Sequence, residues 1–63
     1  MNKFFIKCIN NKNKKEYFLI NDNVLNATNN VADKSLQMCL YADMNGVLYV
    51  RDFDEFNEKF TIL

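Results

Sequence analysis

A β-hairpin pattern runs through residues 35–51, whose sequence is SLQMCLYADMNGVLYVR. Apolar and polar positions alternate along residues 35–42, and residues 47–51 continue as a second apolar-rich strand. Between the two, Asn45-Gly46 predicts a two-residue type I′ turn, because both central residues of that turn need positive φ. The alternative is a longer turn that starts at Asp43 and holds Gly46 in the left-handed conformation, which changes the hairpin register.

A second hairpin is predicted near the start of the chain. Residues 3–9 and 15–20 read as strands, and the intervening residues 10–14, NNKNK, are typical of a turn. Both strands carry apolar residues on both faces, which indicates burial on two sides or a contact with another copy. Residues 21–34 are expected to form a polar loop with one turn of helix, since Asn and Thr interrupt their helical spacing.

The clearest helix is predicted at residues 52–60. Asp52 is a candidate N-cap, and Glu55 follows three positions later, as in a capping box. Three phenylalanines recur at helical spacing, so that one aromatic face is expected to pack on the sheet. They are Phe53, Phe56 and Phe60. Residues 61–63 are expected to form a short strand or a docked tail.

These elements predict one α+β domain over residues 1–63. Two antiparallel β-hairpins would form a small sheet or partial barrel, with one C-terminal helix packed on it.

The composition excludes several classes of function. The chain has 63 residues, no His, one Gly and a formal net charge of zero. Without His, the commonest general base and metal ligand is missing. One Gly excludes the usual glycine-rich phosphate loops, and zero net charge argues against broad electrostatic attraction to nucleic acid. We therefore expect no enzyme, no metal and no cofactor.

Cysteines and carboxylates have structural interpretations. Cys8 and Cys39 are isolated, with no Cys-x-x-Cys motif, which predicts two small apolar core residues rather than a redox pair or metal site. The carboxylates are expected to serve a turn, a helix cap and an exposed helix face. They are Asp43, Asp52, Asp54, Glu55 and Glu58.

The start of the chain lacks the pattern of a secretory signal. The apolar run at residues 4–6 ends at Lys7. No segment approaches the ~20 apolar residues of a membrane span, so that no membrane contact is expected. These features predict a cytoplasmic protein with reduced thiols.

Charge is unevenly distributed, with five Lys and no acid in residues 1–15. Lys12, Lys14 and Lys15 precede Tyr17 and form a candidate basic and aromatic patch for single-stranded nucleic acid or a nucleotide. Small barrels stack bases on rings in a positive groove in this way. The alternative is a solubilising turn beside a core ring, and ring exposure distinguishes the two.

Nine aromatic residues exceed what one thin core needs. Tyr is favoured at interfaces, because its ring is buried while its hydroxyl stays hydrated. Tyr41, Tyr49 and Arg51 are therefore a candidate partner-binding surface, and Tyr49 and Arg51 point the same way on a strand. In so short a chain, burial and conformational entropy nearly cancel, which favours a protein partner and a homo-oligomer such as a dimer.

Residues 15–60 resemble a small bacterial domain family of unknown function. The matching stretches are Lys15-Glu16-Tyr17, Leu40-Tyr41, residues 46–51 (GVLYVR) and Phe56. They correspond to a Tyr-rich strand, a Trp-Val-Arg-Pro strand end and a helix with a Phe one turn in. Tyr49 stands for the Trp, Asp52 stands for the Pro, and the family's His-Phe-Lys-Gly opening is missing. The resemblance implies a small-barrel fold with an apposed helix, no established activity, and Arg51 as a partner contact.

The leading functional hypothesis is a non-catalytic protein-binding module. A tiny chain with eleven Asn and many Lys resembles the products of compact, AT-rich bacterial or phage genomes. The concrete form of the hypothesis is a phage-encoded inhibitor that blocks a host defence enzyme by stoichiometric binding. The alternative is a barrel-like binder of single-stranded nucleic acid or nucleotide through the N-terminal basic hairpin.

Overall fold

The hairpin predicted at residues 35–51 is present and lies at one edge of a β-sheet. In the computed structural model, which describes residues 5–27 and 37–63, β3 (Gln37–Asp43) pairs antiparallel with β4 (Leu48–Asp52). Alternation places Tyr41 opposite Tyr49 on one face of the pair, and Leu40 opposite Val50 on the other.

The turn between β3 and β4 is the longer of the two predicted alternatives. Gly46 has a φ of 85°, whereas Asn45 is not among the described residues with positive φ, so a type I′ turn is wrong. The Asp43 carbonyl accepts from the Gly46 N–H at 3.0 Å, and the Asp43 N–H donates to Val47 O at 3.1 Å. The Asp43 carboxylate also accepts from the Asn45 N–H at 2.9 Å, which holds Asn45 in an ordinary turn conformation.

The strands form one antiparallel sheet in the order β4-β3-β2-β1-β5, so the predicted small sheet is confirmed, whereas its composition of two hairpins alone is corrected to five strands. Strand β1 (Ile6–Asn10) pairs with β2 (Glu16–Leu25), and β2 pairs in turn with β3. The chain end forms β5 (Phe60–Ile62), which lies beside β1. The two hairpins are thus merged by the β2–β3 pairing, which joins segments far apart in sequence.

Strand β2 extends five residues beyond its predicted end at position 20. The polar segment Asn21–Asp22–Asn23 was expected to be loop, yet it continues the strand through two irregularities in the register with β3. Asn21 Oδ1 accepts from the Asn23 N–H at 2.8 Å, and Gln37 Nε2 donates to Asp22 O at 2.8 Å. Bulges of this kind bend a strand, so pairing with β3 overrides the low β-propensity of Asn and Asp. Residues 28–34 of the predicted loop lie outside the described residues.

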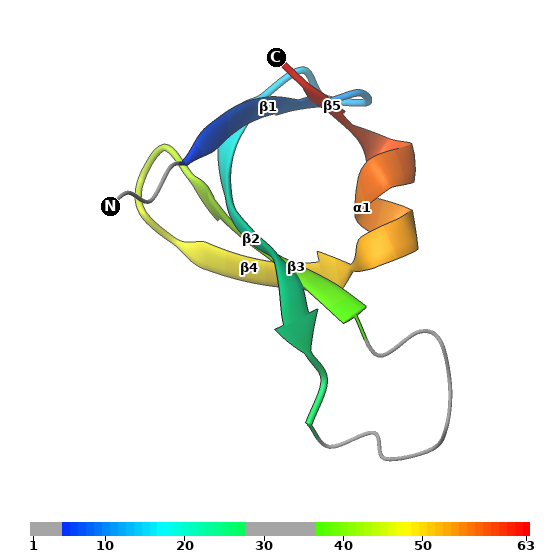
Figure 1. Cartoon of the computed structure of the whole chain (residues 1–63). Coiled ribbons are helices and arrows are strands. Elements are labelled where there is room, and N and C mark those ends of the chain that lie inside the picture. The colour runs from blue at the N-terminus through cyan, green and yellow to red at the C-terminus, as the bar shows by residue number, and fades with distance from the viewer. Residues whose placement is uncertain (1–4, 28–36) are drawn as a thin grey trace.

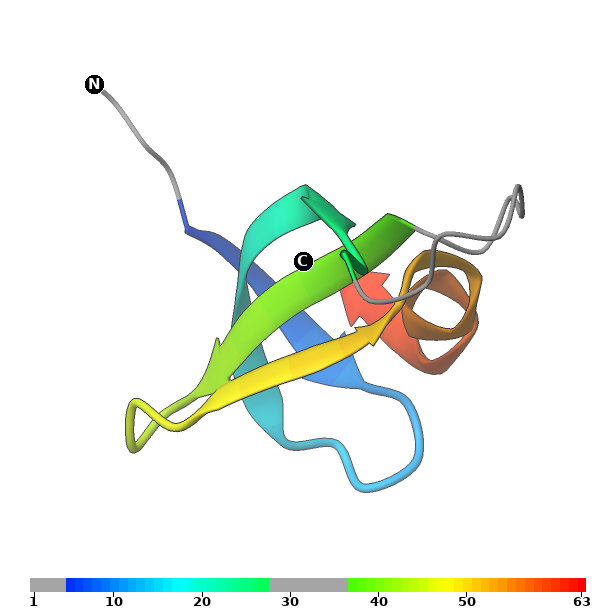
Figure 2. The same cartoon turned by 90° about the horizontal axis from the view of Figure 1, so that it is seen from below.

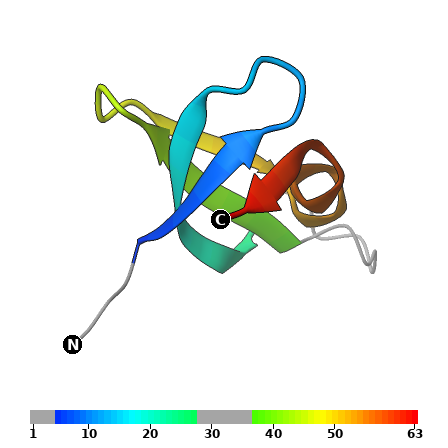
Figure 3. The same cartoon turned by 90° about the horizontal axis from the view of Figure 1, so that it is seen from above.

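The sheet is curled, and α1 (Phe53–Lys59) spans its open side (Figure 1). The helix follows β4 directly and leads directly into β5, so it connects the two edge strands of the sheet. Figures 2 and 3 show the strands broadside, with α1 to one side of them. The α+β class with a C-terminal helix is confirmed, and the sheet is open rather than closed into a barrel.

The helix begins as predicted at its N-cap. Asp52 Oδ2 accepts from the backbone N–H groups of Asp54 at 3.1 Å and Glu55 at 3.2 Å. At the other end, the Phe60 N–H donates to Phe56 O, and Phe60 itself is extended, which ends the helix. The predicted strand at residues 61–63 is confirmed as the continuation of this extended segment in β5.

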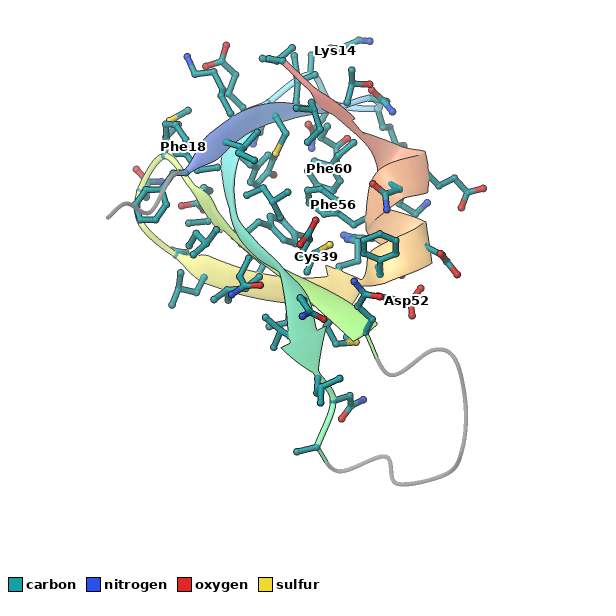
Figure 4. The ribbon with its side chains drawn as sticks, viewed as in Figure 1. Lys14, Phe18, Cys39, Asp52, Phe56 and Phe60 are labelled. Atoms are coloured by element: carbon teal, nitrogen blue, oxygen red, sulfur yellow. The ribbon has the colours of Figure 1, made fainter. Side chains whose placement is uncertain are left out.

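The core lies between the inner face of the sheet and α1. Phe56 and Phe60 stack with centroids 4.4 Å apart, and Cys39 lies on the same side, as Figure 4 shows. The core members are Cys8, Leu19, Cys39, Tyr41, Phe56 and Phe60. Both cysteines are buried and free, so their prediction as core residues is confirmed.

Burial also changes the chemistry of the two thiols. It raises the pKa of Cys8, and it raises the pKa of Cys39 to about 11. Both groups are therefore protonated and unreactive at neutral pH.

In the described part of the chain, no helix is long and apolar enough to cross a membrane.

Candidate functional site

The charged side chain of Arg51 lies on the inner face of the sheet, where three contacts fix its position. Its Nε donates to the Tyr41 hydroxyl at 3.1 Å, and its Nη1 donates to Glu55 Oε2 at 3.2 Å. Its Cζ lies 5.8 Å from the centroid of the Phe60 ring, within cation–π distance. The hydrogen bond to Tyr41 raises the pKa of Arg51 further, so the guanidinium is always charged.

Strand register and helix spacing bring these groups together. Cys39 is the partner of Arg51 and Tyr41 is the partner of Tyr49, so Tyr41 and Arg51 are diagonal neighbours on one face. Glu55 follows Arg51 by four residues, and the start of α1 turns it back over the guanidinium. Three elements, β3, α1 and β5, therefore position one arginine.

A pocket of about 560 Å³ opens beside Arg51, between the β1–β2 turn and the end of α1. Its lining residues are Asn10, Asn11, Lys12, Asn13, Arg51, Glu58 and Lys59. Three cationic side chains face one carboxylate in this lining, so the pocket favours an anionic group.

The β1–β2 turn forms a fixed wall of this pocket. The Asn11 N–H donates to Lys59 O at 2.9 Å, and Thr61 Oγ1 donates to Asn11 Oδ1 at 2.6 Å. Asn10 Oδ1 accepts from the N–H groups of Lys12 and Asn13, which closes the turn on itself. Hydrogen bonds to α1 and β5, together with those inside the turn, therefore fix the backbone that bounds the pocket.

Tyr49 extends the site towards the β3–β4 turn. Its ring stacks on Tyr41 with centroids 5.3 Å apart and planes at 19°, and it meets Tyr17 edge-on at 6.1 Å. Its hydroxyl donates to Asp43 Oδ2 at 2.9 Å, and this hydrogen bond raises the pKa of Tyr49. The residue remains 38% exposed, so its ring offers both an apolar face and an oriented hydroxyl to a partner.

A second, smaller pocket of about 410 Å³ lies at this end of the site. Its lining residues are Lys15, Glu16, Tyr17, Asp43, Met44, Asn45 and Tyr49. We call Tyr49, Arg51 and the two pockets beside them the Arg51 surface.

The structure places the predicted partner-binding residues together, but they differ in how far they are exposed. Tyr49 and Arg51 are accessible, whereas Tyr41 is only 3% exposed. Tyr41 therefore supports the other two, by stacking on Tyr49 and by accepting from Arg51, and its ring offers no surface of its own.

The predicted basic patch is divided between the two pockets. Lys12 lines the pocket beside Arg51, Lys15 lines the pocket beside Tyr49, and Lys14 lines neither. Lys14 has a φ of 63°, the left-handed conformation that ends the turn. Tyr17 is half-buried and lies edge-on to Phe60 at 5.4 Å, so most of its ring faces the core.

Sequence reasoning missed the groups that hold Arg51. The sequence pattern predicts Glu55 as part of a helix cap and Phe60 as part of the aromatic face, and neither as a contact of Arg51. The four-residue spacing between Arg51 and Glu55 was the available signal, since it suits an ion pair across a helix start. Nothing in the sequence indicated that Asn11 would tie the first turn to α1.

Comparisons of this chain with protein-family models, with curated proteins and with solved structures found no match. The resemblance of residues 15–60 to a bacterial family therefore stays a prediction.

Proposed function

We propose that the protein is a non-catalytic module that binds another protein through the Arg51 surface. The observation that carries this proposal is the positioning of Arg51 by Tyr41, Glu55 and Phe60 before any partner binds. An arginine held in one conformation loses little side-chain entropy on binding, so more of its interaction energy appears as affinity.

The partner would present an acidic group to Arg51. A guanidinium has five N–H donors, and within residues 5–27 and 37–63 Tyr41 and Glu55 use two of them. The remaining donors suit a carboxylate, which accepts paired hydrogen bonds. Lys12 and Lys59 in the same pocket add positive charge, and Tyr49 supplies an aromatic contact. Arg and Tyr are among the residues that dominate binding energy at protein interfaces.

The concrete form of the proposal is stoichiometric inhibition of an enzyme, as a phage-encoded protein would act on a host defence enzyme. Such an inhibitor needs a rigid surface and no chemistry of its own. The small size of the chain, its fixed arginine and its half-exposed tyrosine support this form.

The first prediction concerns binding by the Arg51 surface. We expect the tagged protein to capture one partner from a bacterial lysate in a fixed stoichiometry, with or without Lys7→Gln, and Arg51→Gln to lose that partner. Lys7 is the matched control, because it carries the same charge on the opposite face of the sheet, in an exposed pair with Glu16. Equal capture by Arg51→Gln and the wild-type protein, with both shown to be folded, would contradict the proposal.

Salt dependence distinguishes the nucleic-acid alternative. Binding to single-stranded DNA or RNA should weaken steeply with salt and should depend on Lys12 and Lys15. An aromatic and arginine contact with a protein responds much less. Tight, salt-sensitive binding of an oligonucleotide that Lys12→Gln abolishes would replace the protein-binding proposal.

A further inference from the structure

Strand β4 is an edge strand whose outward backbone groups belong to two apolar residues. The Asp43–Val47 pair is hydrogen-bonded, and hydrogen-bonded and non-hydrogen-bonded pairs alternate along an antiparallel ladder. Tyr49 therefore turns its N–H and C=O towards β3, whereas Leu48 and Val50 turn theirs away from the sheet. Since β4 ends the strand order, no strand among the described residues pairs with those groups.

The same two residues are also exposed on the outer face. Leu48 is 61% exposed and Val50 is 55% exposed, and the half-buried Leu40, the partner of Val50 on β3, lies beside them. Natural sheets protect an edge with Lys, Pro or a bulge, and β4, with the sequence LYVRD, has none of these. Its single cation, Arg51, is held on the inner face by Tyr41.

We propose that two copies of this chain associate by antiparallel pairing of β4 with β4. With the two-fold axis at Tyr49, Leu48 of each copy lies opposite Val50 of the other, and both are residues with outward backbone groups. Two such pairs form four N–H···O hydrogen bonds across the axis. On the outer face, the two leucines and two valines form one apolar cluster. This inference is independent of the proposed function.

A second copy is the occupant that this edge fits, because the edge is complementary to itself. A two-fold interface uses the same surface twice, and the two-residue spacing of Leu48 and Val50 satisfies that symmetry in one register. The other edge strand, β5, has only three residues, and Thr61 within it already donates to Asn11.

The available area predicts a weak dimer. A standard interface removes ~800 Å² from each partner, about a sixth of the 4626 Å² that this chain exposes. One five-residue strand with two exposed apolar side chains buries less than that. We therefore expect a monomer at low micromolar concentration and a dimer only towards millimolar concentration.

Sedimentation over that concentration range, combined with amide hydrogen exchange, tests the proposal. The amides of Leu48 and Val50 should become protected as the dimer forms, whereas the amide of Tyr49 is protected in the monomer as well. Val50→Lys should abolish the dimer, and Ile62→Lys should leave it unchanged. Ile62 is a matched control, since it is a β-branched edge residue that is 48% exposed on β5.

Three results would overturn the proposal. They are a monomer at every concentration, a dimer that persists in folded Val50→Lys, and a dimer in which the Leu48 and Val50 amides gain no protection. The exchange measurement uses the unmodified chain, so it decides the question even if a variant fails to fold.

Discussion

At the scale of single residues, Asp43 determines more than a turn signal indicates. Its Oδ1 accepts from the N–H groups of Asn45 at 2.9 Å and Val47 at 3.0 Å, and its Oδ2 accepts from the Tyr49 hydroxyl. These hydrogen bonds, led by the one from Val47, lower the pKa of Asp43 below its usual range. One carboxylate therefore connects the turn geometry, the hairpin register and the orientation of Tyr49.

The pH dependence of stability should report on Asp43. Because its pKa is lower in the folded protein, its carboxylate stabilises the fold above the unfolded-state pKa, and this contribution is lost as the pH falls through the folded-state pKa. We expect wild-type protein to have a higher Tm than Asp43→Asn at neutral pH, and the difference to narrow in acid. Thermal unfolding over this pH range measures it. A Tm difference that stays constant with pH would contradict the assignment.

At the scale of elements, α1 depends on its cap and on its packing. A helix of seven residues is too short to be stable alone in water. Asp52 satisfies two of its free N–H groups, while Phe56 docks its inner face on the sheet.

Removal of the N-cap should weaken the fold measurably. Asp52→Ala is expected to lower the free energy of unfolding by about 1 kcal/mol, because the N–H groups of Asp54 and Glu55 lose their acceptor. Asp52→Asn keeps a side-chain oxygen at the cap and should stay close to the wild type. Urea denaturation of the three proteins measures the difference, and an Asp52→Ala variant as stable as the wild type would show that the cap contributes nothing.

At the scale of the whole molecule, the aromatic core connects the helix to both ends of the curled sheet. Phe56 lies between the ring of Tyr41, at 5.1 Å, and the ring of Phe60, at 4.4 Å. Since α1 links edge strands β4 and β5, loss of this packing affects every element at once. Because the core is small, each of its rings contributes a large share of the buried apolar surface.

Phe56→Ala should unfold the domain or nearly do so. Truncation of a phenylalanine that is 1% exposed is expected to lower the free energy of unfolding by about 3–5 kcal/mol, a large part of the stability of a small domain. Phe53→Ala, on the same helix but only partly buried, should cause a smaller loss. Circular dichroism during thermal unfolding compares the two. A similar Tm for both variants would mean that the core is not centred on Phe56.

Local signals in the sequence were sufficient for much of the fold. Alternation predicted the β3–β4 hairpin, Asp52 predicted the N-cap, and Phe56 was placed in the core. Each depends on residues within a few positions of one another. The same reasoning failed for Asn21–Asp22–Asn23, because a strand of polar residues is held by its neighbour β3 rather than by its own propensity.

The candidate site was partly readable for the same reason. Two residues apart on one strand, Tyr49 and Arg51 had to share a face. No local pattern indicated that Tyr41 would be buried beside them. Nor did a pattern indicate that Lys12 and Lys15 would line different pockets. Those outcomes depend on the curl of the sheet and on the docking of the β1–β2 turn against α1.

The sequence by itself determined the class of this protein, its central hairpin, its capped helix and the absence of His from any site. Tertiary structure alone decided the strand order of the sheet, the pairing of β5 with β1, and the contacts from three separate elements that hold Arg51. The physical reason is the separation along the chain over which each kind of interaction acts. Turns, caps and alternation act between near neighbours in the chain, whereas strand order and side-chain contacts arise only when distant segments compete for the same partners.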